Sequence, residues 1–340
     1  MVEAQHSIIV TGGAGYVGSH IAWLLAQQGY HVIIIDNFIH NQHFNPAWAT
    51  VYRNDFADIE VLKELFTKHY VSAVIHCAGF IEVGQSVKDP ALFYENNVAK
   101  TIALLQTMMA YGIKHFIFSS SCAVYGNPEH IPMTEEHPQK PLSPYGKTKA
   151  MVEALLPDFA QAYGLKYVSL RYFNVAGAFP EEGLGECHTP ETHIIPLLLD
   201  AALEQKPFTL FGNDYATKDG TPVRDYVHVR DIAQAHILAL HHLLKGLPSE
   251  VFNIGIGHGY TVKELVSAVQ EVCRAPITTS VQKRRQGDAP ILLADATRAR
   301  TILQWQPLYS ELSFILKSAH AFYIVQKIKH EKELRYQQQQ

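Results

Sequence analysis

The chain has 340 residues and a formal net charge of −4, with 47% hydrophobic and 18% charged residues. This balance is typical of a globular enzyme with room for two lobes, and it argues against nucleic acid or an anionic membrane as a partner. No apolar run reaches about 18 residues, and residues 1–52 contain no Lys or Arg, so neither a membrane span nor a signal or transit peptide is expected. The four cysteines lack metal-ligand spacing, which predicts reduced thiols and a cytoplasmic protein.

Short β-branched segments alternate with amphipathic segments through the first half of the chain. The predicted strands are Ser7–Val10, Val32–Ile35, Val51–Arg53, Ala73–His76, His115–Ser119 and Tyr167–Arg171. The predicted helices between them are Val17–Gln28, Ile59–His69, Ala91–Tyr111 and Tyr145–Tyr163. Such alternation gives right-handed β-α-β units, and strands that are apolar on both faces need helices on both sides. The predicted fold class is therefore α/β, with a Rossmann-type doubly wound parallel sheet.

The pattern changes after Arg171. Residues 174–192 are rich in Gly, Pro and Glu, which predicts a long loop. A strand and a helix in Val223–Leu244 are expected to return to the first lobe, and they are followed by a strand at Val251–Ile254 and helices at Val262–Arg274 and Ala294–Leu303. We therefore predict a first domain of residues 1–173 plus about 223–250, a smaller α/β substrate-binding lobe of about 174–222 plus 251–330, and a tail at 331–340. The closing Gln337–Gln340 run of this tail is expected to be frayed.

A glycine-rich turn follows the first predicted strand. Gly12, Gly15 and Gly18 give a G-x-x-G-x-x-G spacing. One glycine permits the tight turn, one lets backbone N–H groups approach a pyrophosphate, and one lets the following helix pack closely on the strand. The amino end of that helix then faces the phosphates. A strand before the turn and a helix after it make this a predicted dinucleotide site.

Asp36 ends the second predicted strand. A carboxylate at this place can accept hydrogen bonds from both ribose hydroxyls, and it repels a 2′-phosphate. A 2′-phosphate would need a nearby cation, and no lysine or arginine precedes Arg53. We therefore predict NAD rather than NADP as the cofactor, and the first domain as the NAD-binding domain.

Other residues follow the next strands. Asp55 follows the third strand, which would place it near the adenine, and Ala78 and Gly79 follow the fourth, where small residues let a cofactor approach the backbone. Asn96 and Asn97 fall within a predicted helix, where asparagine is disfavoured. They have either a buried hydrogen-bonding role or a solvated position.

Tyr145 and Lys149 lie four residues apart, so both project from one face of a predicted helix, whereas Lys147 points to another face. A tyrosine of ordinary pKa, about 10, is a poor base at neutral pH. An ammonium group nearby, together with the positive nicotinamide ring, would lower that pKa. The pair then suits proton removal from a hydroxyl group, although the spacing by itself also fits a surface pair.

Three serines end the strand before this helix. A hydroxyl there can bond to the reacting oxygen and pass its proton to the phenolate of Tyr145. Ser121 is the candidate residue for this role. The alternative is a polar strand end that caps a turn.

Seven segments in order carry a family resemblance. They are Thr11–His20 (TGGAGYVGSH), His76–Val83 (HCAGFIEV), Phe118–Gly126 (FSSSCAVYG), Ser143–Lys149 (SPYGKTK), Leu170–Gly177 (LRYFNVAG), Phe211–Val229 (FGNDYATKDGTPVRDYVHV) and Arg284–Asp288 (RRQGD). Together they resemble the extended short-chain dehydrogenase/reductase family, and within it the UDP-glucose 4-epimerases. The resemblance runs from about Ile8 to Pro307.

The resemblance implies a role for each matching residue. The implied catalytic residues are Ser121, Tyr145 and Lys149. The implied cofactor-binding residues are Gly12, Gly15, Tyr16, Val17, Gly18, Asp36, Asn37, Asp55, Phe56, Ala78, Gly79, Asn96 and Phe173. The implied UDP-sugar-binding residues are Asn174, His193, Arg224, Arg285, Asp288 and Leu292. The chemistry of both arginines agrees, because each offers paired donors to a pyrophosphate, and the alternative for each is a surface ion pair.

Two positions depart from the family. Ile81 stands where members often carry a lysine that touches the cofactor ribose, so this contact is expected to be looser. His193 stands where some members have asparagine. A third position, Leu292, is not a departure from the family, but the resemblance places it at the border of the implied sugar pocket. Bulky aromatic residues there are associated with rejection of N-acetylated sugars and small ones with acceptance, and leucine is intermediate.

The expected activity is interconversion of UDP-glucose and UDP-galactose, a step of galactose metabolism, through a 4-keto intermediate. Tyr145, through or beside Ser121, takes the proton of the 4-OH while the C4 hydride moves to NAD. The keto sugar then turns about its pyrophosphate link and is reduced on its other face. Arg224 and Arg285 are expected to hold the UDP. The alternative is 4-epimerisation of another UDP-sugar, with an N-acetylhexosamine, a pentose or a uronic acid.

Other functions fit the sequence less well. A nucleotide-sugar dehydratase would carry an Asp-Glu pair after the serines, but Cys122–Val124 has no carboxylate. A non-catalytic NAD-binding protein would often lack Tyr145 or Lys149. No metal site is predicted, because no H-E-x-x-H motif occurs and Cys187, His188 and His193 are read as loop or substrate-pocket residues. The resemblance also implies a homodimer, formed by the helices near residues 91–111 and 145–163.

Overall fold

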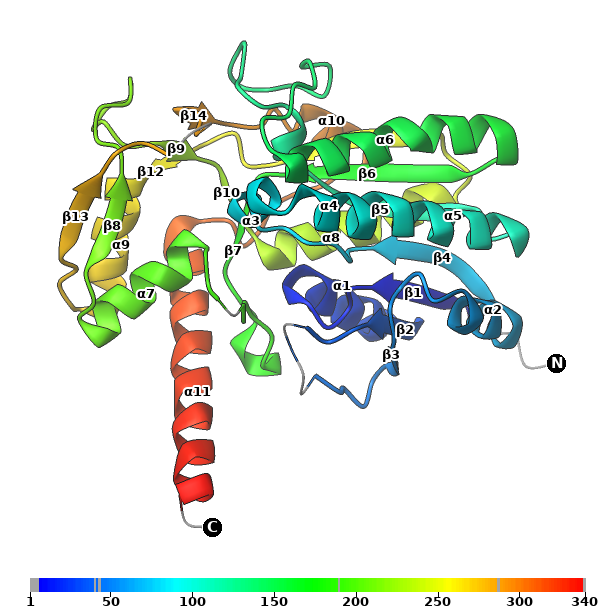
Figure 1. Cartoon of the computed structure of the whole chain (residues 1–340), viewed down its shortest axis with the longest axis horizontal. Coiled ribbons are helices and arrows are strands. Elements are labelled where there is room, and N and C mark those ends of the chain that lie inside the picture. The colour runs from blue at the N-terminus through cyan, green and yellow to red at the C-terminus, as the bar shows by residue number, and fades with distance from the viewer. Residues whose placement is uncertain (1–5, 40, 42–43, 189, 286–287, 339–340) are drawn as a thin grey trace.

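The computed structural model describes residues 6–39, 41, 44–188, 190–285 and 288–338. Gln286 and Gly287 of the Arg284–Asp288 segment lie outside the described residues, as do Gln339 and Gln340 of the predicted tail. A seven-stranded, fully parallel sheet forms the centre, in the order β11-β6-β5-β4-β1-β2-β3 (Figure 1). Its strands are β1 (Ser7–Thr11), β2 (His31–Asp36), β3 (Thr50–Arg53), β4 (Val71–His76), β5 (His115–Ser121), β6 (Lys166–Tyr172) and β11 (Glu250–Ile254). The order reverses between β1 and β4, which confirms the predicted doubly wound sheet.

Helices cover both faces of this sheet. One face packs against α1 (Tyr16–Gln27), α8 (Val229–Leu244) and α10 (Thr297–Ile302), and the other against α2 (Ile59–Lys68), α5 (Lys100–Ala110) and α6 (Pro144–Tyr163). Neighbouring residues of each strand serve opposite cores. Ile34 belongs to the first core, and Ile33 and Ile35 to the second. This burial on both faces explains the nearly continuous apolar runs of the strands.

The strand β11 differs from its predicted place. The sequence put Val251–Ile254 in the second lobe, but β11 pairs with β6 along its whole length and forms an edge of the main sheet. Phe252 and Trp305 are fully buried in the core that α1 and α8 cover. An apolar strand pattern shows that both faces of a strand are buried, but it cannot show which sheet has an open edge for that strand.

The remaining elements gather beside the carboxyl ends of the central strands (Figure 1). Three small sheets lie here, formed by β7 (Asn174–Ala176) with β10 (Tyr226–His228), by β9 (Val223–Arg224) with β12 (Tyr260–Thr261) and β14 (Ile291–Leu292), and by β8 (Phe208–Phe211) with β13 (Thr279–Gln282). A separate core joins α7 (Ile194–Glu204), α9 (Val262–Cys273) and α11 (Leu312–Gln338). The division of the chain into two domains stays a prediction.

The helix α11 projects away from the rest of the chain (Figure 1). Ile315 and Leu316, near its start, are fully buried, which anchors it to the smaller core. The helix continues to Gln338, so the described part of the predicted tail is helical, and the fraying of Gln337–Gln340 stays a prediction. Lysine, glutamate and glutamine all have good helix propensity, so this polar segment can extend a helix that is already formed.

The predicted helix Ala91–Tyr111 is divided into three parts. α3 (Val83–Lys88) precedes it, and then α4 (Pro90–Tyr94), a π-helical segment at Glu95–Ala99, and α5 follow one another. A π-helical segment inside an α-helix is rare, and such segments often occur at functional sites.

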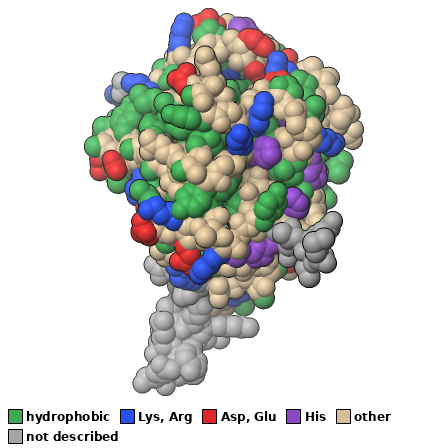
Figure 2. Space-filling model, turned by 90° about the vertical axis from the view of Figure 1, so that its right-hand side faces the viewer, with side chains coloured by type: hydrophobic (Ala, Val, Ile, Leu, Met, Phe, Trp, Pro, Cys, Tyr) green, Lys and Arg blue, Asp and Glu red, His purple; other side chains and the backbone are tan. Residues whose placement is uncertain are grey.

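Histidines mark the face on which the parallel strands begin, which Figure 2 shows. His31 opens β2 and its ring lies 5.3 Å from that of His69, while His115 opens β5 and bonds to the backbone oxygen of Ser72. This face is opposite the carboxyl ends where ligands bind to such sheets, so these histidines are structural. Within the described part of the chain, no helix has the length and apolar character needed to cross a membrane.

Candidate active site

The predicted cofactor residues come together at the carboxyl edge of the sheet. Gly12 follows β1, Asp36 ends β2, Ala78 comes shortly after β4, and Ser121 ends β5. β2, β1, β4 and β5 are neighbours in the sheet, and the strand order reverses between β1 and β4. Ligands of doubly wound sheets bind at this switch point.

The glycine turn is too tight for side chains at two of its positions. Gly12 has a φ of +68°, and a Cβ there would lie 2.6 Å from the backbone nitrogen of Ala78. A Cβ at Gly18 would lie 2.2 Å from the carbonyl oxygen of Gly12. Gly15 is the N-cap of α1 and supplies no side-chain acceptor to the first amides of the helix. The turn therefore provides the close approach and the helix amino end that a pyrophosphate requires.

Replacing Gly18 with alanine should destabilise the protein and release a bound dinucleotide. The new Cβ would collide with backbone, not with a movable side chain, and overpacking of this kind costs about 1–3 kcal/mol. Urea unfolding and the NAD content of the purified protein measure the two effects. Gly84→Ala is the matched control, because nothing lies within 4 Å of its Cβ position. Equal stability and equal NAD content in the two variants would contradict the prediction.

Asp36 is held by the backbone around the turn. Its Oδ2 accepts a hydrogen bond from the amide of Ala14 at 3.0 Å, and its Oδ1 accepts one from the amide of Phe38 at 2.7 Å. The sheet brings Arg53 into register with Asp36, and the guanidinium lies 3.9 Å from the centroid of the Phe38 ring. Sequence distance had suggested that no cation was near, but neighbouring strands bring Arg53 close.

The other predicted cofactor residues occupy different surroundings. Asp55 pairs with Lys100 at 2.5 Å, and both side chains are about one-third exposed. Phe56 and Phe173 are each 6% exposed and belong to apolar clusters, so their side chains pack within the protein. Asn37 accepts a hydrogen bond from the amide of Ile39. Contacts of these residues with a cofactor stay predictions.

Asn96 and Asn97 lie buried in the π-helical segment. Asn97 accepts a hydrogen bond from the amide of Phe80 and donates to its carbonyl oxygen, both at 2.9 Å, and Asn96 donates to Asn97 at 3.1 Å. The structure confirms the buried hydrogen-bonding role and excludes the solvated pair. These bonds fix the loop after β4, including Gly79, whose φ is +157°.

Ser121, Tyr145 and Lys149 come together between β5 and α6. Ser143 caps α6 by accepting a hydrogen bond from the amide of Gly146, as expected of a serine before a proline at N1. The helix can approach the end of β5 because Gly146 has no side chain; a Cβ there would lie 2.5 Å from the carbonyl oxygen of Ala123.

Tyr145 forms a hydrogen bond with Ser121. Lys149 Nζ donates to the Ser119 carbonyl oxygen at 2.8 Å and lies 6.0 Å from the Tyr145 ring centroid.

Burial dominates the ionisation of this pair. It raises the pKa of Tyr145 to about 12, although the Ser121 hydrogen bond opposes the shift, and it lowers the pKa of Lys149 to about 8. The sequence led us to expect a lowered tyrosine pKa. Within the chain itself the loss of hydration outweighs the hydrogen bond with Ser121, so a lower pKa of Tyr145 needs a further positive charge in the site.

Replacing Lys149 with methionine is expected to stabilise the folded chain near pH 7 by about 3 kcal/mol. Burial lowers the pKa of Lys149 from its ordinary 10.5 to about 8, so below that pH the folded protein carries an ammonium that is better hydrated when unfolded. Between the two values the unfolded chain binds more protons, so the native protein gains stability as pH rises and the advantage of the variant shrinks. Urea unfolding of both proteins between about pH 7 and pH 10 tests this; a difference that does not change with pH would refute it.

Polar networks beneath the site were missed in the sequence. Ser119 bonds to His236 at 3.0 Å and to Cys77 at 3.2 Å, which fixes the carbonyl that receives Lys149. Glu153 accepts hydrogen bonds from Ser120 at 2.5 Å and from Arg171 Nε at 3.0 Å. A glutamate in the middle of a helix usually faces solvent, so the sequence carried no signal of this burial.

The predicted UDP-sugar residues fall into two groups. The first group contains Arg224, which forms an ion pair with Asp288. Leu292 of β14 also belongs to it, because it is paired in register with Arg224 of the neighbouring strand β9. This group adjoins the catalytic residues, because the charge of Arg224 acts on Cys122, which follows Ser121. Arg285 lies on Phe211, with its guanidinium 4.0 Å from the ring centroid.

Asp225, which the sequence analysis did not single out, holds this region together. Its carboxylate accepts hydrogen bonds from the amides of Ile256, Gly257 and Ala294 at 2.8–3.1 Å. These three amides belong to the segments after β11 and β14. Asp225 therefore positions Arg224 and Leu292 beside the main sheet.

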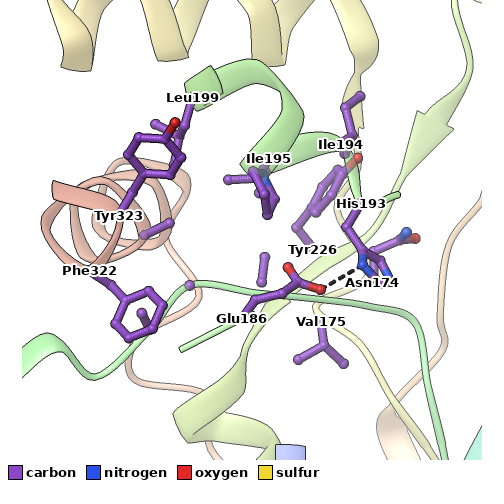
Figure 3. A pocket seen from close by; sticks show the side chains of 15 residues that line it. Asn174, Val175, Glu186, His193, Ile194, Ile195, Leu199, Tyr226, Phe322 and Tyr323 are labelled. Atoms are coloured by element: carbon purple, nitrogen blue, oxygen red, sulfur yellow. Dashed lines mark ion pairs between the residues drawn. The ribbon is translucent and has the colours of Figure 1, made fainter. Parts of the chain in front are cut away.

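Asn174 and His193 form the second group, at a pocket between β7, α7 and α11 (Figure 3). His193 Nδ1 lies 2.6 Å from Glu186 and 3.0 Å from Glu191. Burial alone would lower the pKa of His193, but hydrogen bonds and the charges of both glutamates raise it to about 10. Ser121, Tyr145 and Lys149 do not line this pocket, so it adjoins the candidate catalytic centre without containing it.

Comparison with known proteins agrees with this arrangement. The profile of the NAD dependent epimerase/dehydratase family matches residues 8–255. The chain belongs to this family. Among members of the epimerase/dehydratase family, the UDP-glucose 4-epimerase of Rhizobium leguminosarum bv. trifolii is 48% identical over 317 residues, which cover 93% of this chain and 97% of that protein.

Solved structures of epimerase/dehydratase family members give the same result. The crystal structure of UDP-glucose 4-epimerase from Brucella ovis in complex with NAD is 41% identical, with a TM-score of 0.90 over 93% of this chain and 97% of that one. The enzyme from Bifidobacterium longum in complex with NAD+ and UDP is 33% identical, with a TM-score of 0.86 over 94% and 98%. The predicted family resemblance and fold are thereby confirmed.

Proposed function

We propose that this chain is an NAD-dependent UDP-glucose 4-epimerase, an isomerase that interconverts UDP-glucose and UDP-galactose. The observation that carries the proposal is the meeting of Ser121, Tyr145 and Lys149 at the carboxyl edge of a doubly wound sheet, beside the Gly12–Gly18 turn. The relatives named above are UDP-glucose 4-epimerases, and two of their structures contain NAD.

The residues present fit NAD. Two positions of the turn admit only glycine, and the amino end of α1 offers amides without a side-chain cap. Asp36 lies at the carboxyl end of β2, where a carboxylate can accept hydrogen bonds from ribose hydroxyls, since its two oxygens together offer about four acceptor positions. When bound, NAD supplies the site with a reversible hydride acceptor.

The residues of the chain would then handle the proton and the substrate. Tyr145 removes the proton of the sugar 4-OH as the C4–H bond breaks, and it returns a proton when the 4-keto group is reduced on its other face. Ser121 bonds to the reacting oxygen, and Lys149 supplies positive charge next to the phenolate. Arg224 and Arg285 bind the pyrophosphate. The keto sugar can therefore turn while its UDP stays bound to the protein.

The direct test is to incubate the purified protein with UDP-galactose, without added NAD, and to separate the products. Formation of UDP-glucose up to an equilibrium mixture is expected, because the cofactor is regenerated in each turnover. No product, even with NAD supplied, would reject this substrate. UDP-N-acetylhexosamines, UDP-pentoses and UDP-uronic acids would then be compared, since Leu292 lies in register with Arg224 and borders the proposed sugar site.

We also propose that the protein is a cytoplasmic homodimer. The helices α4, α5 and α6 and their ends carry exposed apolar side chains, which favour an interface between two copies. These side chains are between 42% and 57% exposed and belong to Leu92, Tyr111, Met151 and Tyr163. Light scattering of the native protein and of Met151→Asp tests the dimer. A monomeric native protein would reject it, and recovery in the membrane or secreted fraction would reject the location.

A further inference from the structure

Four metal-ligating side chains from one short segment meet beside the pocket. Glu186, His188, Glu191 and His193 each offer one nitrogen or oxygen atom, and among the described residues these four atoms lie within 4.8 Å of one another. His193 Nδ1 is 2.6 Å from Glu186 Oε1 and 3.0 Å from Glu191 Oε1, and His188 Nδ1 is 3.4 Å from Glu186 Oε1. The spacing is E-x-H-x-x-E-x-H. The sequence analysis considered His188 and His193 with Cys187, without the two glutamates, and predicted no metal site.

Two carboxylates of the cluster share one imidazole. The side chain of Glu186 is only 9% exposed and that of Glu191 18%. Both carboxylates approach the same nitrogen of His193, and an imidazole nitrogen carries one proton at most. One proton therefore cannot make a full hydrogen bond to both. A divalent cation between the two carboxylates would balance both of their charges.

We propose that Glu186, His188, Glu191 and His193 form a binding site for Zn2+. Zinc takes imidazole nitrogens and carboxylate oxygens at about 2.0–2.2 Å in tetrahedral geometry, which places ligand atoms about 3.3 Å apart. The separations of 3.0 and 3.4 Å lie close to this value, whereas the 2.6 Å contact between His193 and Glu186 is a hydrogen bond that would have to lengthen when an ion binds. Ca2+ and Mg2+ prefer sites made only of oxygen, so two histidines favour zinc over either of them.

The site would fix the wall of the pocket. Glu186 and His193 both line the pocket, and His193 is the N-cap of α7 (Figure 3). A bound ion would therefore join the loop after β7 to the start of α7. The cluster also lies close to the glycine turn, because the charges of Glu186 and Glu191 help to raise the pKa of Tyr16, whose hydroxyl donates to the Gly177 carbonyl oxygen at 2.5 Å. The proposed role of the ion is to hold this loop in place, and no step of the proposed reaction uses it.

Metal binding by the full-length protein tests the proposal. The chain is stripped with a chelator, mixed with ZnCl2, passed through a gel-filtration column and analysed for bound zinc. One zinc per chain is expected, with affinity at least 10-fold lower in His188→Ala and in Glu191→Gln. His130→Gln is the matched control, because His130 is exposed and pairs with the ring of His137, outside the cluster. It should bind zinc as the native protein does.

Cobalt gives a second readout that does not depend on activity. Co2+ in a tetrahedral site of nitrogen and oxygen ligands has intense visible absorption bands, and His188→Ala should remove them. Circular dichroism shows whether each variant is folded, and Glu191→Gln replaces His188→Ala if the latter does not fold. Absence of zinc binding, or binding that is unchanged in both cluster variants, would overturn the proposal. Neither result bears on the epimerase assignment, which the UDP-galactose assay tests.

Discussion

Replacing Tyr145 with phenylalanine is expected to lower turnover of UDP-galactose by about 10³-fold while NAD stays bound. General acid–base catalysis by a positioned group contributes roughly 10²–10⁴-fold, and this substitution removes only the phenolic oxygen. Tyr145 is buried and forms a hydrogen bond with Ser121, so its hydroxyl is directed at the serine that ends β5. The aromatic ring is kept, so packing around α6 should change little.

Initial rates with UDP-galactose, together with the NAD content of the purified variant, measure this effect. Tyr70→Phe is the matched control, because Tyr70 is 61% exposed and lies outside the helices of the proposed dimer interface. It should retain the native rate. A Tyr145→Phe variant with nearly native turnover would show that another group transfers the proton. Loss of NAD from the variant would mean that the hydroxyl supports cofactor binding instead.

Replacing Glu153 with alanine is expected to lower the free energy of unfolding by about 3–5 kcal/mol, because it leaves the buried Arg171 guanidinium without its counter-ion. Both side chains are 5% exposed, and the pair has a Nη2–Oε2 separation of 2.5 Å. Burial alone would lower the pKa of Arg171, but the hydrogen bonds and charge of Glu153 raise it, so the arginine stays charged. Ser120 also loses its acceptor in the variant.

Urea unfolding compares this variant with two others. Glu60→Ala is the surface control, since the Glu60 side chain is 82% exposed and its pairing with Lys63 should matter little. The double variant Glu153→Met with Arg171→Met should regain much of the stability, because removing both charges is far less costly than removing one. A Glu153→Ala protein as stable as the native one would show that water or Glu135 compensates Arg171, whose Nη1 donates to the Glu135 carbonyl oxygen.

The sequence was sufficient to predict the first half of the fold and the order of its motifs. Strands such as Ile8–Val10 are apolar on both faces, which requires helices on both sides of a parallel sheet, and this holds wherever the strands lie. The turn at Gly12–Gly18 also follows from local constraints, because Gly12 has a φ of +68° and a Cβ at Gly18 would collide with the carbonyl oxygen of Gly12. Tyr145 and Lys149 share a helix face through local geometry alone.

The tertiary structure decided which distant segments meet. β11 could be recognised as a strand, but only the open edge beside β6 made it part of the main sheet. Arg53 comes next to Asp36 through strand register, and Glu153 becomes a buried partner of Arg171 through packing of α6 on β6. The pKa values of Tyr145 and Lys149 shift because surrounding elements remove water from them. The periodicity of the sequence shows which face of each helix or strand is apolar. The hydration of a side chain and its pairing with distant residues depend instead on the neighbours that the folded chain provides.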